Sequence, residues 1–391
     1  MPTGNGIMRF EFATAGRILF GAGTLQEVAP AAAGFGRRAL IVCGRTTARA
    51  ESLLDHLKAQ GMACNTFTVS GEPTLDTVRA GVKLAGEKSC DVVIGIGGGS
   101  AIDAGKAIAA LITNGGDLMD YLEVIGKGQP LTHPSVPYIA VPTTAGTGAE
   151  VTRNAVLFSP EHRVKVSLRS PLMLPRLAVV DPELTLSLPS DLTAGTGLDA
   201  LTQLIEPYVC NSPNPVVDAL CHAGMRKAAG ALRLACLQGS DRQAREDMAM
   251  ASLFGGLALA NARLGAVHGF AGPLGGMFRA PHGMICARLL PLVMETNIAA
   301  LQVRAPSSPA LRRFAETAQT LTGQAGATAA DGLAWLQTLC TDLAVPSLSH
   351  FGLKEEDIPQ VVRQAGKASS MKGNPIGLTE LELAEVLRRA L

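Results

Sequence analysis

The stretch that most constrains this chain covers residues 91–106, DVVIGIGGGSAIDAGK. It begins with an apolar run typical of a buried strand, and it continues after three consecutive glycines as a helical pattern of apolar residues. The glycines are Gly97, Gly98 and Gly99. Because glycine allows close backbone approach and a helix N-terminus presents free N–H groups, this order makes a place for a phosphate. Ser100 can cap the helix or donate its hydroxyl to a phosphate oxygen.

This spacing is neither the dinucleotide G-x-G-x-x-G pattern nor a Walker A loop. The alternative is a tight turn between a strand and a helix that binds nothing. A second turn of similar composition, PTTAGTGAE, follows a short predicted strand at 138–141. Its hydroxyls and glycines can line a pyrophosphate or ribose, or they can simply begin a capped helix. Two such turns in one domain favour a dinucleotide over either turn taken alone.

Short apolar strands alternate with helical patterns through the first half of the chain. The other expected strands and a hairpin cover residues 16–23, 39–43, 65–69, 155–168 and 176–180. This rhythm predicts an α/β domain with a parallel sheet covered on both faces, in which ligands bind at the carboxyl ends of the strands. We therefore expect a dinucleotide-binding domain over residues 1–187.

From residue 188 onward, alanine, leucine and polar residues recur at helical period, which predicts an all-α C-terminal domain over 188–391. Expected helices lie near 191–209, 214–237, 241–263, 283–300, 308–323, 330–343, 355–369 and 378–390.

Charge and cysteine usage narrow the classes of function. The 34 Lys+Arg and 33 Asp+Glu leave a net charge of +1, which argues against nucleic acid or an acidic membrane surface as a partner. No apolar run approaches the roughly 20 residues of a membrane span, and the first residues show no secretory signal. The eight cysteines are scattered without a C-x-x-C pair. That pattern is typical of reduced thiols in a cytoplasm and argues against a cysteine-based zinc site.

The helical half holds residues that can bind a metal. Asp199 and Gln203 are four apart, so a helix would place them on one face. Between His268 and His282 we expect Pro273, Gly275, Gly276 and Pro281 to break any helix, so that the two imidazoles come from separate elements that can converge. One carboxylate, one amide and two imidazoles suit iron(II), zinc or another first-row divalent ion better than magnesium. The alternative is that the histidines are satisfied polar groups and that Asp199 caps a helix.

These motifs together resemble those of the iron-containing alcohol dehydrogenase family, whose wider group includes glycerol dehydrogenases and dehydroquinate synthases. The glycine-rich unit with Asp103 and Lys106 is similar to the family's GGGSxxDxxKA loop, and PTTAGTGAEVT is similar to its second cofactor loop. GRILFGAG resembles its opening strand, and LPRLAVVDPELT resembles the strand before its helical domain. Asp199, His268 and His282 fall where the family keeps metal ligands. The resemblance covers nearly the whole chain.

The resemblance implies an NAD(P)-dependent oxidoreductase that moves a hydride between the nicotinamide and the carbon of a small alcohol or carbonyl compound. The metal would act as a Lewis acid in the cleft between the domains. The diphosphate would lie on the first glycine-rich turn, the threonines of the second turn would contact the diphosphate and ribose, and a lysine would lie near the ribose. The implied cofactor contacts are Gly97, Gly98, Gly99, Ser100, Asp103, Thr143, Thr144, Thr147 and Lys165, with Asp103 toward the nicotinamide end. The resemblance also implies a homodimer or larger homo-oligomer, and we expect a cytoplasmic enzyme.

Two positions depart from the family pattern. Gln203 stands where the family usually has histidine, and an amide oxygen is a weaker ligand than an imidazole. Gly272 stands where the family commonly has a second histidine, which is thought to sit near the nicotinamide and relay protons. This chain would need another relay or water. Iron, zinc and the absence of a metal all remain open at this point.

The second strand ends without the aspartate that members preferring NAD often carry there. It continues instead into Gly44 and Arg45, and Arg45 can attract a 2′-phosphate. We predict that NADP is accepted at least as well as NAD. The alternative is that Arg45 only faces solvent.

Three other functions are weighed against the dehydrogenase. A maleylacetate reductase-like, metal-independent reductase ranks second, because such enzymes usually change the aspartate and Asp199 is kept here. A cyclase resembling dehydroquinate synthase ranks low, because the helical half has few basic residues near the motifs. The last is a non-catalytic cofactor-binding protein.

Overall fold

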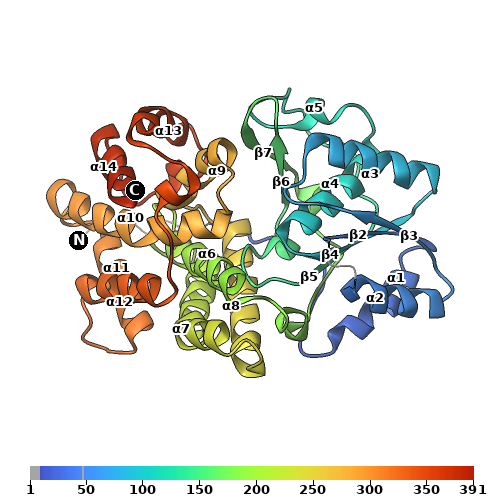
Figure 1. The fold of residues 1–391 in the computed structure, drawn as a ribbon, viewed down its shortest axis with the longest axis horizontal. Helices are drawn as coiled ribbons and strands as arrows, with labels where there is room; N and C mark the ends of the chain where they lie inside the picture. Colours follow the sequence, from blue (N-terminus) through green and yellow to red (C-terminus); the bar gives the residue numbers. More distant parts are fainter. Residues whose placement is uncertain (1–8, 46–47) are drawn as a thin grey trace.

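The structure is a computed structural model that describes residues 9–45 and 48–391. Figure 1 shows a half built on a sheet and a helical half lying side by side. The strands of the sheet are β1 (Ile18–Phe20), β2 (Arg38–Cys43), β3 (Ala63–Thr68), β4 (Val92–Gly97), β5 (Tyr138–Pro142) and β8 (Leu177–Val180). They form one parallel sheet in the order β1-β8-β5-β4-β2-β3.

Helices cover both faces of this sheet. They are α1 (Val28–Ala33), α2 (Ala48–Ala59), α3 (Leu75–Glu87), α4 (Gly99–Asn114) and the short α5 (Leu118–Tyr121). Because successive strand residues point to opposite faces, Leu40 of β2 joins the core beneath α3 and α4, while Ile41 joins the core beneath α1 and α2. The expected parallel sheet with two covered faces is confirmed.

The strand order creates a crevice at one edge of the sheet. The chain leaves β2 toward β3 on one side and returns to place β4 on the other side of β2. In open α/β sheets, ligands bind at such a reversal, outside the carboxyl ends of the strands. The ends of β2 and β4 are where the first glycine-rich turn and Arg45 lie.

The ring of Tyr138, at the start of β5, occupies the space that side chains at two further glycines would need. It contacts Gly95 on β4 and Gly105 on α4, and a Cβ at Gly105 would lie 3.0 Å from the Tyr138 hydroxyl oxygen. The hydroxyl donates to the carbonyl of Ile102 at 2.7 Å. The glycines therefore let α4 lie close to the sheet, which places the N-terminus of α4 at the crevice.

The expected hairpin is also present, as β6 (Asn154–Ser159) and β7 (Val164–Arg169). It lies between the sheet and the helical half, where α9 packs against β7 (Figure 1). The helices of the second half are α6 (Ser190–Val209), α7 (Pro215–Leu237), α8 (Arg242–Asn261), α9 (Ala266–Phe278), α10 (His282–Arg304), α11 (Pro309–Thr322), α12 (Ala329–Asp342), α13 (Ile358–Ala365) and α14 (Glu380–Ala390).

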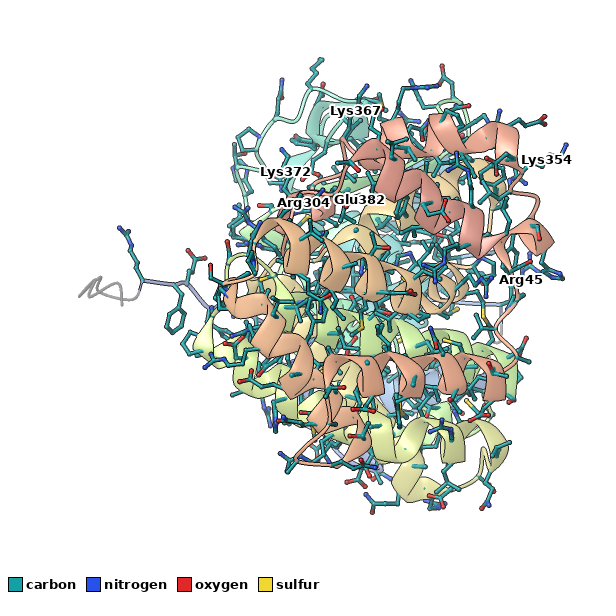
Figure 2. The ribbon with its side chains drawn as sticks, turned by 90° about the vertical axis from the view of Figure 1, so that its left-hand side faces the viewer. Arg45, Arg304, Lys354, Lys367, Lys372 and Glu382 are labelled. Atoms are coloured by element: carbon teal, nitrogen blue, oxygen red, sulfur yellow. The ribbon has the colours of Figure 1, made fainter. Side chains whose placement is uncertain are left out.

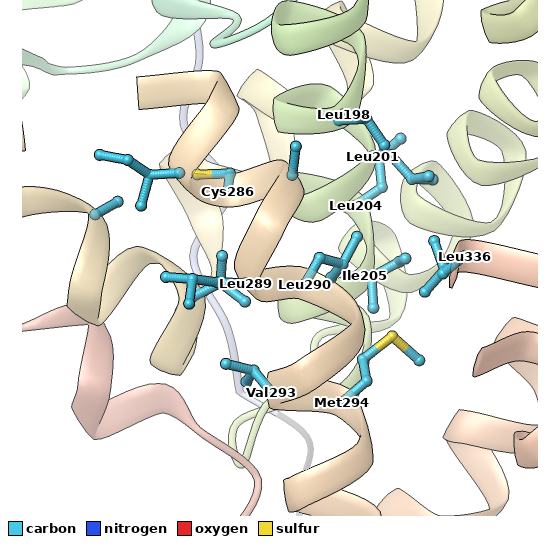
Figure 3. Close-up of a cluster of buried hydrophobic side chains, with 14 of the residues drawn as sticks. Leu198, Leu201, Leu204, Ile205, Cys286, Leu289, Leu290, Val293, Met294 and Leu336 are labelled. Carbon is cyan, nitrogen blue, oxygen red and sulfur yellow. The ribbon is translucent and has the colours of Figure 1, made fainter. Parts of the chain in front are cut away.

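The core of the helical half forms around α6 and α10. Leucines of α6, among them Leu201 and Leu204, lie with Leu289 and Leu290 of α10 in one buried cluster (Figure 3). At the surface, Arg304 of α10 lies 3.1 Å from Glu382 of α14 (Figure 2). Among the described residues, α10 is the only individual helix that is long and apolar enough to cross a membrane. However, 67% of its most apolar 18-residue segment is buried inside the protein. Its burial identifies α10 as a core helix of this half.

Helix α9 corrects one expectation from the sequence. Pro273 and the glycines near it do not break the helix, which continues through them to Phe278. The break between α9 and α10 falls after Phe278 and before His282. A proline inside a helix forfeits one backbone hydrogen bond, and the glycines allow close packing on the hairpin. A Cβ at Gly276 would lie 2.8 Å from the carbonyl oxygen of Arg163. The helix expected at 355–369 is also shorter than predicted, since α13 ends at Ala365.

Candidate active site

The two glycine-rich turns meet at the carboxyl ends of β4 and β5. The backbone N–H of Thr143 donates to the carbonyl of Gly97 at 2.8 Å. Gly98 is the N-cap residue of α4, which begins at Gly99 and contains Ser100 in its first turn. The first N–H groups of a helix have no partner within the helix, so this end of α4 offers donors and a positive dipole end to an anion.

Threonines of the second turn lie directly against the glycines of the first. The methyl group of Thr144 would lie 3.3 Å from a Cβ at Gly98, and the hydroxyl oxygen of Thr147 would lie 3.2 Å from a Cβ at Gly99. Larger residues at either glycine would press on the second turn. The predicted contacts from two distant parts of the sequence are therefore neighbours in space.

A hollow of about 140 Å³ lies at the same strand ends. It is lined by Gly44, Arg45, Ala50, Ile96, Gly97, Gly98 and Thr143. Arg45 is exposed and labelled in Figure 2. Its side chain therefore stands at the rim of a space beside the first glycine-rich turn.

Lys106 lies behind the two turns and has no exposed surface. Its ammonium donates to the carbonyls of Ala149 and Asn154, each at 2.7 Å, and to the hydroxyl of Thr152 at 3.0 Å. It also lies 3.7 Å from the Asp103 carboxylate. Burial lowers the pKa of Lys106, and Asp103 opposes that shift. Lys106 thus ties α4 to the chain that leaves the second turn.

Asp103 and Glu150 complete the buried polar layer around Lys106. Asp103 Oδ2 accepts from the N–H of Val156 at 3.0 Å, which ties α4 to the hairpin. Burial raises the pKa of Asp103, and Lys106 opposes the rise. Burial also raises the pKa of Glu150 to about 7. Asp103 therefore contacts both Val156 and Lys106, while 14% of its side chain is exposed.

Lys165 projects from β7 into the junction between the hairpin and α9. Its ammonium lies 2.8 Å from Glu72, and only 8% of its side chain is exposed. A Cβ at Gly275 of α9 would lie 3.2 Å from the Lys165 ammonium nitrogen. Lys165 therefore lies where the two halves of the chain meet.

Four side chains of the helical half bring their donor atoms together. Asp199 comes from α6, His268 from α9, and His282 and Cys286 from successive turns of α10. Their donor atoms all lie within 4.8 Å of one another. Asp199 Oδ1 lies 3.5 Å from Nε2 of each histidine, and Cys286 Sγ lies 3.8 Å from His282 Nε2. The two histidines thus converge from separate helices.

Two of these donor atoms are buried and unsatisfied. Within the described part of the chain, Asp199 Oδ1 and His268 Nε2 have no hydrogen-bond partner. A buried polar atom without a partner costs about 1 to 3 kcal/mol. A divalent ion would coordinate both atoms, so the residues present fit such a metal.

Glu206 is a site residue that the sequence analysis missed. His268 Nδ1 donates to Glu206 Oε2 at 2.6 Å, and the N–H of Val267 donates to Glu206 Oε1 at 2.7 Å. A carboxylate behind a histidine fixes the ring so that its other nitrogen faces the metal. Burial lowers the pKa of His268, but Glu206 and Asp199 outweigh burial and raise it to about 9. Glu206 lies two helical turns after Asp199 on α6, and this spacing was the signal in the sequence that could have identified it.

Gln203 and Gly272, the two positions that depart from the family pattern, have different surroundings. The side-chain amide of Gln203 is buried and donates to the carbonyl of Gly146 at 3.0 Å, so it joins α6 to the second glycine-rich turn. Apart from its own helix backbone and chain neighbours, no described atom lies within 4 Å of a Cβ built at Gly272. Gly272 therefore leaves open space on α9, one turn after His268.

Comparison with known proteins decides the family. Residues 15–182 match the family described as iron-containing alcohol dehydrogenase, and residues 193–391 match the C-terminal part of the Fe-containing alcohol dehydrogenase family. The chain belongs to the iron-containing alcohol dehydrogenase family. The resemblance stated from the sequence is confirmed, and so is the combination of an α/β half with a helical half.

Relatives of this family are similar over nearly their whole length. The 1,3-propanediol dehydrogenase of Klebsiella pneumoniae is 37% identical over 367 residues, which is 91% of this chain and 92% of the relative. Alcohol dehydrogenase 4 of Schizosaccharomyces pombe is 35% identical and covers 95% of this chain and 87% of its own length. A crystal structure of 1,3-propanediol oxidoreductase superposes with a TM-score of 0.91 at 35% identity, covering 98% of this chain and 100% of that one.

The family assigns the class of reaction. The chain is an alcohol dehydrogenase, an oxidoreductase that transfers a hydride between an alcohol and a nicotinamide cofactor. The family uses NAD(P) and iron. Within the described residues, the donor atoms around Asp199 form a cluster that could hold a metal ion.

Proposed function

We propose that this iron-containing alcohol dehydrogenase interconverts small alcohols and aldehydes or ketones at a metal-assisted site between its two halves. The observation that carries the proposal is the convergence of Asp199, His268 and His282, with two buried donor atoms left unpartnered. In support, the glycine-rich turns lie at the strand ends where α/β sheets bind nucleotides. The domains in this proposal are 1–187 for the cofactor and 188–391 for metal and substrate.

In this proposal the first turn holds the cofactor diphosphate and the second turn completes its cradle. The N–H groups at the start of α4 would donate to the phosphate oxygens, and the threonine hydroxyls would contact the diphosphate and ribose. Lys165 would turn from Glu72 to the ribose, and Asp103 would lie toward the nicotinamide end. The proposed contacts are Gly97, Gly98, Gly99, Ser100, Asp103, Thr143, Thr144, Thr147 and Lys165.

Asp199, His268 and His282 would hold the divalent ion, and Gln203 would add its side-chain amide oxygen, a weaker ligand than imidazole. An ion bound there supplies a Lewis acid that polarises the carbonyl oxygen of the substrate. Side-chain exposure is 33% for His282 but only 3% for Asp199 and 7% for His268. The substrate therefore approaches from the His282 side, while Glu206 holds His268 from behind.

Arg45 supports use of NADP at least as well as NAD. It stands at the rim of the hollow beside the first turn, and it carries a positive charge where a 2′-phosphate would need one. A charge-assisted hydrogen bond contributes about 1.5 to 3 kcal/mol, so Arg45→Ala should lower kcat/KM for NADP by about 10- to 100-fold. The kcat/KM for NAD should change little. Equal losses for both cofactors would show that Arg45 does not contact the 2′-phosphate.

The proposal also includes a small alcohol or carbonyl substrate, a homo-oligomeric state and a cytoplasmic location. The relatives include enzymes named for 1,3-propanediol, and a sulfoacetaldehyde reductase of Bifidobacterium kashiwanohense solved with NAD+ superposes with a TM-score of 0.86 at 27% identity, covering 98% of each chain. Their names support a small alcohol or carbonyl substrate. Light scattering of the purified protein would establish whether it is a homodimer or a larger homo-oligomer.

The proposal is tested by metal removal and replacement, with NADH and NADPH oxidation followed on a panel of aldehydes and oxo acids. We expect a chelator to abolish turnover and one divalent ion to restore it. Turnover that persists without metal would instead indicate a maleylacetate reductase-like reaction. Cofactor binding without turnover on any member of the panel would indicate a non-catalytic protein.

A further inference from the structure

Cys286 contributes a donor atom that the sequence did not lead us to expect. It lies one helical turn after His282 on α10, and its Sγ belongs to the same cluster as the carboxylate of Asp199. We propose that the Cys286 thiolate is the fourth protein ligand of this metal site, and that the site therefore favours zinc more strongly than an all-nitrogen and oxygen site would. The inference rests on the proposed use of a metal, and its test below separates the two.

The distances between donor atoms fit a single ion. Zinc binds nitrogen and oxygen at about 2.0 to 2.2 Å and sulfur at about 2.3 Å, so neighbouring ligands of a four-coordinate ion lie about 3.3 to 3.6 Å apart. In this chain Asp199 Oδ1 lies 3.5 Å from each histidine Nε2, and Cys286 Sγ lies 3.8 Å from His282 Nε2. All four donor atoms lie within 4.8 Å of one another, so an ion bound among them would draw the more widely spaced pairs together.

Burial also favours Cys286 as a ligand. Its side chain is fully buried beside the Asp199 carboxylate, whose Oδ1 is one of two atoms of this cluster that are buried without a hydrogen-bond partner. The other such atom is His268 Nε2. An ion enclosed by these donors would satisfy both atoms, and the thiol sulfur lies within 4.8 Å of each of them.

The side chain of Gln203 forms a hydrogen bond outside the cluster. Its amide nitrogen donates to the carbonyl of Gly146, so the side chain connects α6 with the second glycine-rich turn. The bond to Gly146 leaves the side-chain oxygen of Gln203 as the only atom of this amide that could ligate an ion. A neutral amide oxygen is a weaker ligand for zinc than a thiolate, so Cys286 on α10 is the stronger candidate for the fourth position.

The scattered cysteines gave no sign of this site, because a zinc site that takes one sulfur needs no C-x-x-C pair. Ligation forms a metal–sulfur bond, breaks the S–H bond and releases the proton to solvent. Thiolate ligands favour zinc, whereas carboxylate and imidazole ligands alone suit a wider range of divalent ions. One sulfur in the set therefore shifts the choice of metal toward zinc.

The test uses Co²⁺ as the probe on the full-length apoprotein. A cobalt–thiolate bond gives an intense near-ultraviolet charge-transfer band that nitrogen and oxygen ligands do not give. We expect stoichiometric Co²⁺ to produce this band in the wild type. Cobalt that binds without the band would overturn the proposal even if every variant failed to fold.

Cys286→Ser should abolish the band and weaken zinc binding at least about 10-fold, measured by competition with a chromogenic chelator. Cys340→Ser is the matched control, because Cys340 lies outside the cluster and its thiol donates only to the carbonyl of Ala287. It should keep the band and the affinity. Unfolding curves of both variants would show that they are folded. Equal zinc affinity in the wild type and Cys286→Ser would contradict the assignment.

Competition between Zn²⁺ and Fe²⁺ under anaerobic conditions tests the choice of metal. The zinc-over-iron preference should be larger in the wild type than in Cys286→Ser, and equal preferences would overturn that part of the proposal. If the wild type binds none of these ions, both this inference and the metal-assisted reaction fail. If ions bind and turnover depends on them but the thiolate band is absent, only this inference fails.

Discussion

The proposed cofactor crevice and the proposed metal cluster present polar groups by different means. The crevice presents backbone N–H groups of two glycine-rich turns, and its charged side chains, Asp103 and Lys106, lie behind the turns and hold them in place. The metal cluster presents side chains themselves, and Glu206 lies behind them and orients His268. Substitution of a supporting residue in the crevice should therefore lower stability and cofactor affinity. Substitution of a supporting residue in the cluster should instead lower metal affinity.

Lys106→Met should have the largest effect and should act on the fold. It leaves the carbonyls of Ala149 and Asn154 without their shared donor and leaves Asp103 without its buried partner. Breaking a buried charge network costs about 3 to 5 kcal/mol of unfolding free energy, measured by chemical denaturation. Cofactor binding should weaken as well, while zinc affinity should stay close to that of the wild type.

The matched control is Lys127→Met, which removes an exposed lysine that pairs with Asp120. A surface pair contributes about 0 to 1 kcal/mol, so this variant should remain near wild-type stability. If both lysine variants lost the same stability, Lys106 would not be the tie between α4 and the second turn.

Glu206→Gln should act on the metal and leave the crevice alone. The amide keeps the shape of the side chain but no longer accepts a charge-assisted hydrogen bond from His268 as a carboxylate does. Loss of such a supporting group typically lowers metal affinity about 10- to 100-fold. Zinc competition would measure this loss, and Glu206→Asp should recover part of it.

Dissociation constants for NADH and NADPH should be unchanged in Glu206→Gln. Glu316→Gln is the control, because the Glu316 carboxylate accepts a hydrogen bond from Tyr208 and pairs with Arg312, both away from the cluster. A loss of cofactor affinity equal to the loss of metal affinity would remove the distinction between the two regions.

Glu150→Gln should flatten the pH dependence of stability. Burial raises the pKa of Glu150 from 4.5 to about 7 in the folded protein, so the folded state holds this proton more tightly than the unfolded chain does. The resulting stabilisation is fully present below pH 4.5 and is lost as the pH rises through 7. We expect a difference of about 2 to 3 kcal/mol, measured by denaturation across this range. Parallel wild-type and variant curves would contradict it.

Gly272→His should have the smallest effect on stability. A Cβ there meets no described neighbour within 4 Å, and most residues are better helix formers than glycine, so the unfolding free energy should change by less than about 1 kcal/mol. If this position faces the nicotinamide, the imidazole should add a titration to the pH profile of kcat. Gly276→Ala is the contrast, because its Cβ would lie 2.8 Å from the carbonyl oxygen of Arg163 and should destabilise the junction of α9 with the hairpin.

Part of the site was readable from the sequence because it is local. The glycines at 97–99 and the threonines at 143–147 belong to continuous turns at strand ends, and strand period, glycine content and helix onset are all visible along the chain. The spacing of Asp199 and Gln203 was likewise visible on a single helix, although the sequence did not show that Gln203 bonds to Gly146.

The sequence by itself determined the class of fold, the two glycine-rich turns and three of the proposed metal ligands, because these follow from periodicity, turn chemistry and family motifs. Only the tertiary structure decided that α9 continues through Pro273, because packing on the hairpin outweighs one lost backbone hydrogen bond. It alone brought Glu206 and Cys286 to the histidines from α6 and α10. Contacts between side chains of separate helices depend on how those helices cross, and no local pattern in the sequence encodes that crossing.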